Sequence, residues 1–142
     1  MLLPAETLRD SGTAARKPSI GLSNLYDVVF VLNINSKGWI LEKICKVIAR
    51  HLGLRTTIIF TERNNTVTGW LPAARSYFFS HYKIYMGALN SGILPADSKT
   101  YVWFTHPSFS AGNTVEAFVT ALNQCTTIFT ANSFHAGALA FL

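Results

Sequence analysis

The chain has 142 residues, which is enough for one domain with a core of its own. Hydrophobic residues make up 49% of it and charged residues only 13%, a composition that excludes intrinsic disorder of the whole chain. Polar residues interrupt every apolar stretch before it reaches the ~18 residues of a membrane span. The formal net charge is +5, but no basic stripe alternates with aromatic residues, so we expect no nucleic-acid partner.

Residues 1–25 are predicted to be a flexible basic tail. They are rich in small and polar residues, carry Arg9, Arg16 and Lys17, and show no sustained periodicity. The tail lacks the apolar stretch of a signal peptide, which predicts a cytoplasmic location. Cys45 and Cys125 match no metal or redox spacing, and we expect both to be reduced packing residues.

A strand, a helix and a second strand are predicted first. The β-branched run at 26–33 is typical of a strand buried on both faces. A helix over 38–52 follows, with an apolar stripe that begins at Ile40 and Leu41 and with Glu42 and Lys46 paired on its opposite, solvent-facing side. Residues 54–60 form the second strand, and the short crossover predicts that the two strands are parallel.

The rest of the chain continues this alternation. We expect a short strand at 77–80 with a helix through Leu89, a strand at 101–105, a helix around 115–122, a strand at 126–131 and a last helix that begins at Asn132 and runs to the end. Residues 26–142 are therefore predicted to be one α/β domain, with a doubly wound, mostly parallel Rossmann-like sheet and helices on both faces. The last helix has no stop signal, so we expect the domain to be incomplete at its C-terminus.

Ligands of such sheets bind beyond the carboxyl ends of the strands, which singles out a few polar segments. The loop that contains Asn35, Ser36, Lys37 and Gly38 leads into a helix, where backbone N–H groups favour an anion such as a phosphate. An ordinary strand-to-helix turn explains this loop equally well. Asn132 also follows a predicted strand, at its carboxyl end, so we expect it to bind substrate as well.

His81 and His106 each follow a predicted strand. An imidazole at this edge can donate to a sugar hydroxyl or transfer a proton, and a purely structural role remains open for both. The sequence contains no G-x-S-x-G motif, no paired carboxylates in one element and no cluster of metal ligands, and we expect no metal or cofactor.

Charge is distributed unevenly. From Tyr101 to Leu142, Glu116 is the one charged residue. A typical soluble segment of this length carries roughly ten. We therefore expect a partner over the apolar 101–142 surface, either further chain in a C-terminal domain or a second copy in a homodimer.

The order of these motifs resembles the N-terminal domain of GT-B-fold glycosyltransferases of the family-4 type, which use sugar nucleotides. The resemblance spans about Tyr26 to Leu142 and depends on the loop before the first helix, on WFTHP at 103–107 and on TIFTANSFHAGALAFL at 127–142. It implies a two-domain enzyme whose N-terminal half binds the acceptor and whose C-terminal half binds the nucleotide-sugar donor.

On this resemblance, Ser36, Lys37 and Gly38 face the donor phosphates, His106 is the catalytic residue near the transferred sugar, and Ser133 lines the cleft. The function implied is transfer of a sugar to a saccharide or lipid-linked acceptor, with little activity in the absence of the donor-binding domain. A lipid-linked acceptor implies peripheral contact with the inner face of the membrane. Two alternatives stay open: a non-catalytic Rossmann-like binding module for a phosphorylated metabolite or a partner protein, and a structural fragment that dimerises.

Overall fold

The computed structural model describes residues 25–67, 69–105, 115–133, 137 and 139–140. Five parallel strands form one sheet in the order β2-β1-β3-β4-β5. The strands are β1 (Tyr26–Asn33), β2 (Thr56–Thr61), β3 (Ala74–Phe79), β4 (Lys99–Phe104) and β5 (Thr127–Thr130). The helices are α1 (Ile40–Leu52), α2 (Tyr82–Asn90) and α3 (Val115–Asn123), and a short 3₁₀ turn, η2 (Ile34–Ser36), precedes α1. The predicted α/β class with a parallel, Rossmann-like sheet is confirmed.

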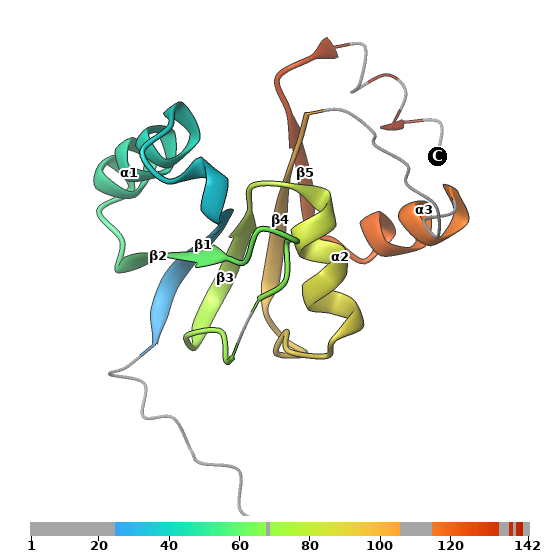
Figure 1. Cartoon of the computed structure of the whole chain (residues 1–142), viewed down its shortest axis with the longest axis horizontal. Helices are drawn as coiled ribbons and strands as arrows, with labels where there is room; N and C mark the ends of the chain where they lie inside the picture. Colours follow the sequence, from blue (N-terminus) through green and yellow to red (C-terminus); the bar gives the residue numbers. More distant parts are fainter. Residues whose placement is uncertain (1–24, 68, 106–114, 134–136, 138, 141–142) are drawn as a thin grey trace, which may run out of the picture.

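Helices cover both faces of the sheet, as Figure 1 shows: α1 lies on one side, and α2 and α3 lie on the other. Successive side chains of each strand point to opposite faces, so one strand contributes to two cores. In β1, Val29 and Val31 pack toward α2 and α3, whereas Phe30 and Leu32 pack toward α1. All four are buried, which explains why the sequence of β1 is a continuous apolar run.

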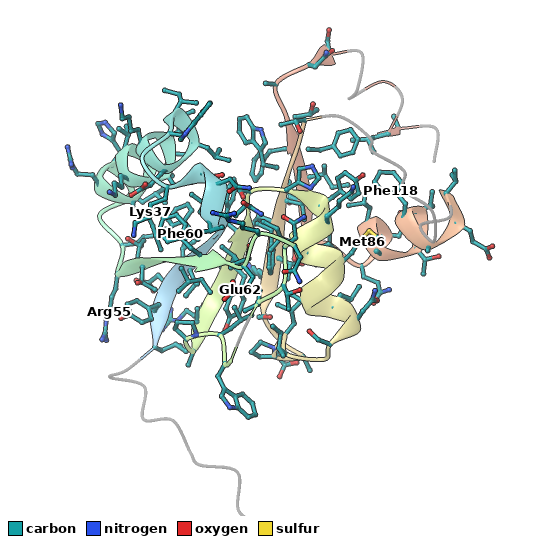
Figure 2. The ribbon with its side chains drawn as sticks, viewed as in Figure 1. Lys37, Arg55, Phe60, Glu62, Met86 and Phe118 are labelled. Atoms are coloured by element: carbon teal, nitrogen blue, oxygen red, sulfur yellow. The ribbon has the colours of Figure 1, made fainter. Side chains whose placement is uncertain are left out.

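The larger core lies between the sheet and the pair α2 and α3. Tyr82 and Tyr85 of α2 are almost fully buried there, and Phe118 of α3 packs edge-on against Tyr82 with ring centroids 5.1 Å apart. In Figure 2, Met86 and Phe118 lie between the two helices. This aromatic packing holds the helix starts in place above the carboxyl ends of β3 and β4.

Two details differ from the sequence prediction. The third strand begins at Ala74, three residues earlier than expected, and the exposed Arg75 hides its alternating pattern. Glu42 does not lie on the solvent side of α1: it is only 8% exposed, while Ile40 on the predicted apolar stripe is 67% exposed. Glu42 does pair with Lys46 as predicted, but it also bonds the backbone in front of the helix, which draws it inward.

Some expectations concern residues that the structure does not describe. These are the tail up to residue 24, His106, and most of the helix expected after Asn132. Within the described part of the chain, no helix combines the length and the apolar character that crossing a membrane requires.

Candidate functional site

A polar crevice opens at the carboxyl ends of β1 and β3. These neighbouring strands flank the point where the winding of the sheet reverses, because the chain leaves β1 toward β2 and later leaves β3 toward β4. Open α/β sheets bind their ligands at this position. The cavity has a volume of about 460 Å³, within the usual range for small-molecule sites. Its walls come from the segments after β1, β2, β3 and β4: Asn33, Asn35, Ser36, Trp39, Ile40, Leu41, Asn65, Ser80, His81, Lys83 and Thr105.

Asn33 fixes the wall on the β1 side. Its Oδ1 accepts a hydrogen bond from the N–H of Asn35 at 2.7 Å and caps the 3₁₀ turn. Its Nδ2 donates to Oδ1 of Asn65, 2.8 Å away in the loop after β2. Asn65 adopts a left-handed backbone conformation with φ of 65°, which asparagine tolerates better than most residues. One amide therefore joins two loops that the sequence places 32 residues apart.

Trp39 provides an aromatic surface at the mouth of the crevice. It precedes α1 as the N-cap residue, makes no side-chain cap hydrogen bond and is 70% exposed. Leaving so large an apolar ring in water costs free energy unless something covers it. The C–H face of a sugar ring or another flat apolar group is suited to stack on it.

His81 and its neighbours form the wall on the β3 side. Ser80 is buried, and its N–H donates to the carbonyl of Val31 at 3.0 Å, which ties the end of β3 to β1. Nδ1 of His81 accepts a hydrogen bond from the N–H of Lys83 at 3.1 Å and so caps α2, and its ring stacks on Tyr82. An accepting Nδ1 places the imidazole proton on Nε2. His81 is thus both a helix cap and a residue of the crevice.

The structure separates the predicted site residues into groups. Asn35, Ser36 and His81 line the crevice together. Lys37 and Gly38 are not part of its lining. Nζ of Lys37 lies 5.9 Å from the ring centroid of Phe60 in β2 (Figure 2), and the N–H of Gly38 donates to the carboxylate of Glu42.

Two further predicted residues, Asn132 and Ser133, follow β5 and are exposed, outside the crevice lining. His106 lies beyond the described residues, although Thr105, directly before it, lines the crevice.

Several residues of the crevice escaped the sequence prediction, chief among them Trp39, Asn65 and Lys83. Trp39 lies within the helix predicted over 38–52, but outside its apolar stripe, and the sequence pattern gave it no role. Asn65 belongs to a polar turn whose partner in β1 is distant in sequence. The Asn-rich turn Arg63-Asn64-Asn65 directly after a strand was the one available signal, since such turns favour left-handed backbone.

The crevice offers mainly hydrogen-bonding groups. Its described lining contains amides, hydroxyls, an imidazole and the ammonium group of Lys83, and no carboxylate. No group of three or more potential metal ligands occurs among the described residues. The free thiols lie elsewhere, and burial raises the pKa of Cys45 to about 11 and raises that of Cys125. Both are therefore packing thiols, as predicted, and poor nucleophiles.

An apolar groove lies on the other side of the molecule from α2 and α3. It has a volume of about 850 Å³, and α1 forms one wall of it through Ile48 and Leu52. Its floor is a row of aromatic rings from four strands: Phe30, Phe78, Tyr101, Trp103 and Phe129. Phe30 and Phe78 lie 5.5 Å apart, and Phe129 lies 6.1 Å from both Phe78 and Tyr101.

The groove exists because the two faces are covered unequally. Five strands spaced about 4.8 Å apart make a surface about 19 Å wide, which requires roughly two helices. In the described structure, α2 and α3 supply two on one face, whereas α1 alone lies on the other. At the amino ends of the strands, the rim of the groove carries Asp27, Arg75, Asp97 and Lys99.

Comparison of the chain with known protein families, with curated proteins and with solved structures found no significant match in any of the three.

Proposed function

We propose that this chain is the acceptor-side domain of a glycosyltransferase, and that the crevice between β1 and β3 binds a saccharide. The observation that carries the proposal is the lining of this crevice: hydrogen-bonding groups from four loops, uncharged apart from Lys83, beside the exposed ring of Trp39. Sugars present hydroxyls around their edge and C–H groups on their faces. Amides such as that of Asn35 hydrogen-bond to sugar hydroxyls, and an indole such as that of Trp39 stacks on the C–H face.

The order of sequence motifs, which resembles that of family-4-type glycosyltransferases, supports the same proposal. In this proposal the reaction transfers a sugar from a nucleotide-sugar donor to a saccharide or lipid-linked acceptor. The described crevice offers Lys83 as its one cation and no carboxylate, which is a poor set of contacts for a donor pyrophosphate and a ribose. A second domain therefore supplies the donor contacts, and the chain without it transfers little or no sugar. The enzyme works in the cytoplasm, at the inner membrane face where its acceptor is lipid-linked.

The apolar groove is the proposed contact surface for that second domain or for a second copy of the chain. Its aromatic floor includes Tyr101, Trp103 and Phe129, which belong to the segment expected to be covered because it is so poor in charge. Water contact with these rings is unfavourable, and a packed helix would remove it. The charged rim at one end gives such a partner a polar border.

Binding of neutral disaccharides tests the proposal. Titration of the chain with a panel of them, followed by tryptophan fluorescence and calorimetry, should reveal binding. Trp39→Ala should weaken this binding by about three- to tenfold, the value of one aromatic stacking contact. Trp70→Ala is the matched control, because Trp70 is 93% exposed and lies outside the crevice.

Two outcomes would contradict the proposal. One is the absence of binding across the panel. The other is an equal loss of affinity in both tryptophan variants, which would place the sugar elsewhere. Binding of a nucleotide or a sugar phosphate without any disaccharide binding would instead favour the non-catalytic module for a phosphorylated metabolite.

A further inference from the structure

Ser80, directly after β3, has a buried hydroxyl that lacks a hydrogen-bond partner. The residue is only 4% exposed, and it lines the crevice. Its backbone N–H donates to the carbonyl of Val31, but no group in the part of the chain that the structure describes bonds its Oγ. Buried polar groups of native proteins are nearly always hydrogen-bonded, because an unpaired one costs free energy. The hydroxyl of Ser80 therefore needs a partner that the described chain does not supply.

The other buried polar side chains of the described structure are all paired. Thr61 at the end of β2 donates its hydroxyl to the carbonyl of the next residue at 2.9 Å. Oγ1 of Thr100 accepts from the N–H that precedes β5, and Glu42 forms an ion pair within α1. None of these three residues lines the crevice. The unpaired hydroxyl thus occurs where a bound ligand would reach it.

Positive charge borders the same end of the crevice. Lys83, in the first turn of α2, is the one cation of the described lining, which contains no carboxylate. The start of a helix adds the positive end of its dipole. The backbone N–H groups of Lys83 and Ile84 already donate to His81, so α2 contributes its field and not further hydrogen bonds. This end of the crevice therefore favours a ligand group with a negative charge.

We propose that Ser80 and Lys83 bind a carboxylate of the ligand, so that the saccharide taken by the crevice is an acidic one, such as a uronic acid. The hydroxyl of Ser80 donates a hydrogen bond to the carboxylate, and the ammonium group of Lys83 balances its charge. One ammonium group matches the single charge of a carboxylate better than the nearly double charge of a phosphate. The inference rests on the proposed function for the saccharide, but not for the anionic group.

Two disaccharides that differ in one group test this inference. Cellobiouronic acid carries a carboxylate where cellobiose carries a CH₂OH group. In calorimetry at neutral pH, the wild-type chain should bind the acid about tenfold more tightly, the value of one hydrogen bond to a charged group. Added salt should weaken binding of the acid and leave that of cellobiose unchanged, because salt screens charges.

A substitution of each binding residue has a matched control. Lys83→Gln should reduce the affinity for the acid to that for cellobiose, whereas Lys99→Gln, which removes an exposed cation outside the crevice, should not change it. Ser80→Ala should weaken binding of the acid about tenfold without lowering the Tm, because no hydrogen bond within the described chain is lost. Thr61→Val removes a buried, paired hydroxyl, and it should lower the Tm and leave the affinity unchanged.

Three results would overturn the carboxylate site. The first is equal affinity of the wild type for the two disaccharides, and the second is an equal loss in Lys83→Gln and Lys99→Gln. The third is tighter binding of glucose 6-phosphate than of glucuronate. A lower Tm with unchanged affinity in Ser80→Ala would give that residue a purely structural role and remove it from the site.

Gluconate separates this inference from the proposed function, because it carries a carboxylate but no sugar ring. Binding of gluconate that is lost in Lys83→Gln, without binding of either disaccharide, would keep the carboxylate site and remove the acceptor assignment. Equal binding of the two disaccharides would do the reverse. Absence of binding of every probe would overturn both.

Discussion

Nδ2 of Asn33 donates a hydrogen bond to Oδ1 of Asn65 across 2.8 Å, and this contact joins the end of β1 to the loop after β2. Asn65 has a second reason to be asparagine, because its φ is 65°. The carbonyl of Asn65 also lies close to α2, 3.6 Å from the position that a Cβ on Gly87 would take. The loop thus connects the edge of the sheet with α2 and forms one border of the crevice.

Two substitutions at Asn65 separate its hydrogen bond from its backbone conformation. Asn65→Gly keeps the left-handed conformation and loses the bond, so the free energy of unfolding should fall by about 0.5–1.5 kcal/mol. Asn65→Ala loses the bond and adds backbone strain of about 1 kcal/mol. Urea unfolding of both variants measures the difference. Equal stability of the two would show that the left-handed backbone carries no cost here.

Tyr77 is fully buried, and its hydroxyl holds the start of β3 in place. The hydroxyl donates to the carbonyl of Pro72 at 2.8 Å and accepts from the N–H of Ala74 at 3.2 Å. Tyr77→Phe keeps the packing but leaves two backbone groups without this partner, so it should reduce the free energy of unfolding by about 1–3 kcal/mol. Tyr101→Phe, which lines the groove, is the control for loss of a hydroxyl. A loss in Tyr77→Phe no larger than in that control would contradict the assigned role.

Local patterns in the sequence were sufficient for most of the fold. The run Tyr26–Asn33 predicted a strand buried on both sides, and Gly53, with its φ of 61°, ends α1 where a helix stop was expected. Both features depend on neighbours in the sequence. The start of β3 at Ala74 was missed because polar residues, among them Arg75, occupy the amino end of this central strand, where Arg75 reaches solvent at the rim of the groove.

The candidate site was predicted only in part, for a different reason. Parallel α/β sheets bind ligands beyond the carboxyl ends of their strands. This rule singled out Asn35, Ser36 and His81, and all three line the crevice. No sequence pattern shows that Asn33 meets Asn65, because this contact joins residues 32 positions apart and depends on the path of the chain in space. Lys37 was assigned to the site by its position in the loop, but its long side chain lies over Phe60 instead.

Phe129 lies at the open side of the apolar groove and is 43% exposed. The dye 1-anilinonaphthalene-8-sulfonate, which fluoresces on apolar surfaces, should bind there and receive excitation energy from Trp103. Phe129→Asp places a charge among the rings and should reduce the dye emission several-fold, because burial of an unpaired charge is unfavourable. Val115→Asp on α3, where Val115 is 54% exposed, is the control and should leave the emission unchanged. Unchanged emission in Phe129→Asp would locate the dye, and any apolar partner, elsewhere.

Acid should destabilise the chain partly through Glu42. Its pKa in the folded state is below the ordinary value of 4.5, because Lys46 and the Gly38 N–H favour the carboxylate. A carboxyl group whose folded-state pKa is depressed contributes stability that is fully present above its unfolded-state pKa and is lost as the pH falls through its folded-state value. The contribution of Glu42 should therefore be constant at neutral pH and decline below pH 4.5.

Glu42→Gln carries no titrating group at this position, so its free energy of unfolding should depend less steeply on pH below 4.5 than that of the wild type. The two curves should differ most at neutral pH and converge in acid, as urea unfolding between pH 2.5 and pH 7 can measure, because protonated Glu42 and glutamine make similar contacts. Glu116→Gln, which removes a glutamate from the first turn of α3, is the control for the loss of one negative charge. A constant difference between Glu42→Gln and the wild type over the whole range would mean that the carboxylate charge is not what stabilises the start of α1.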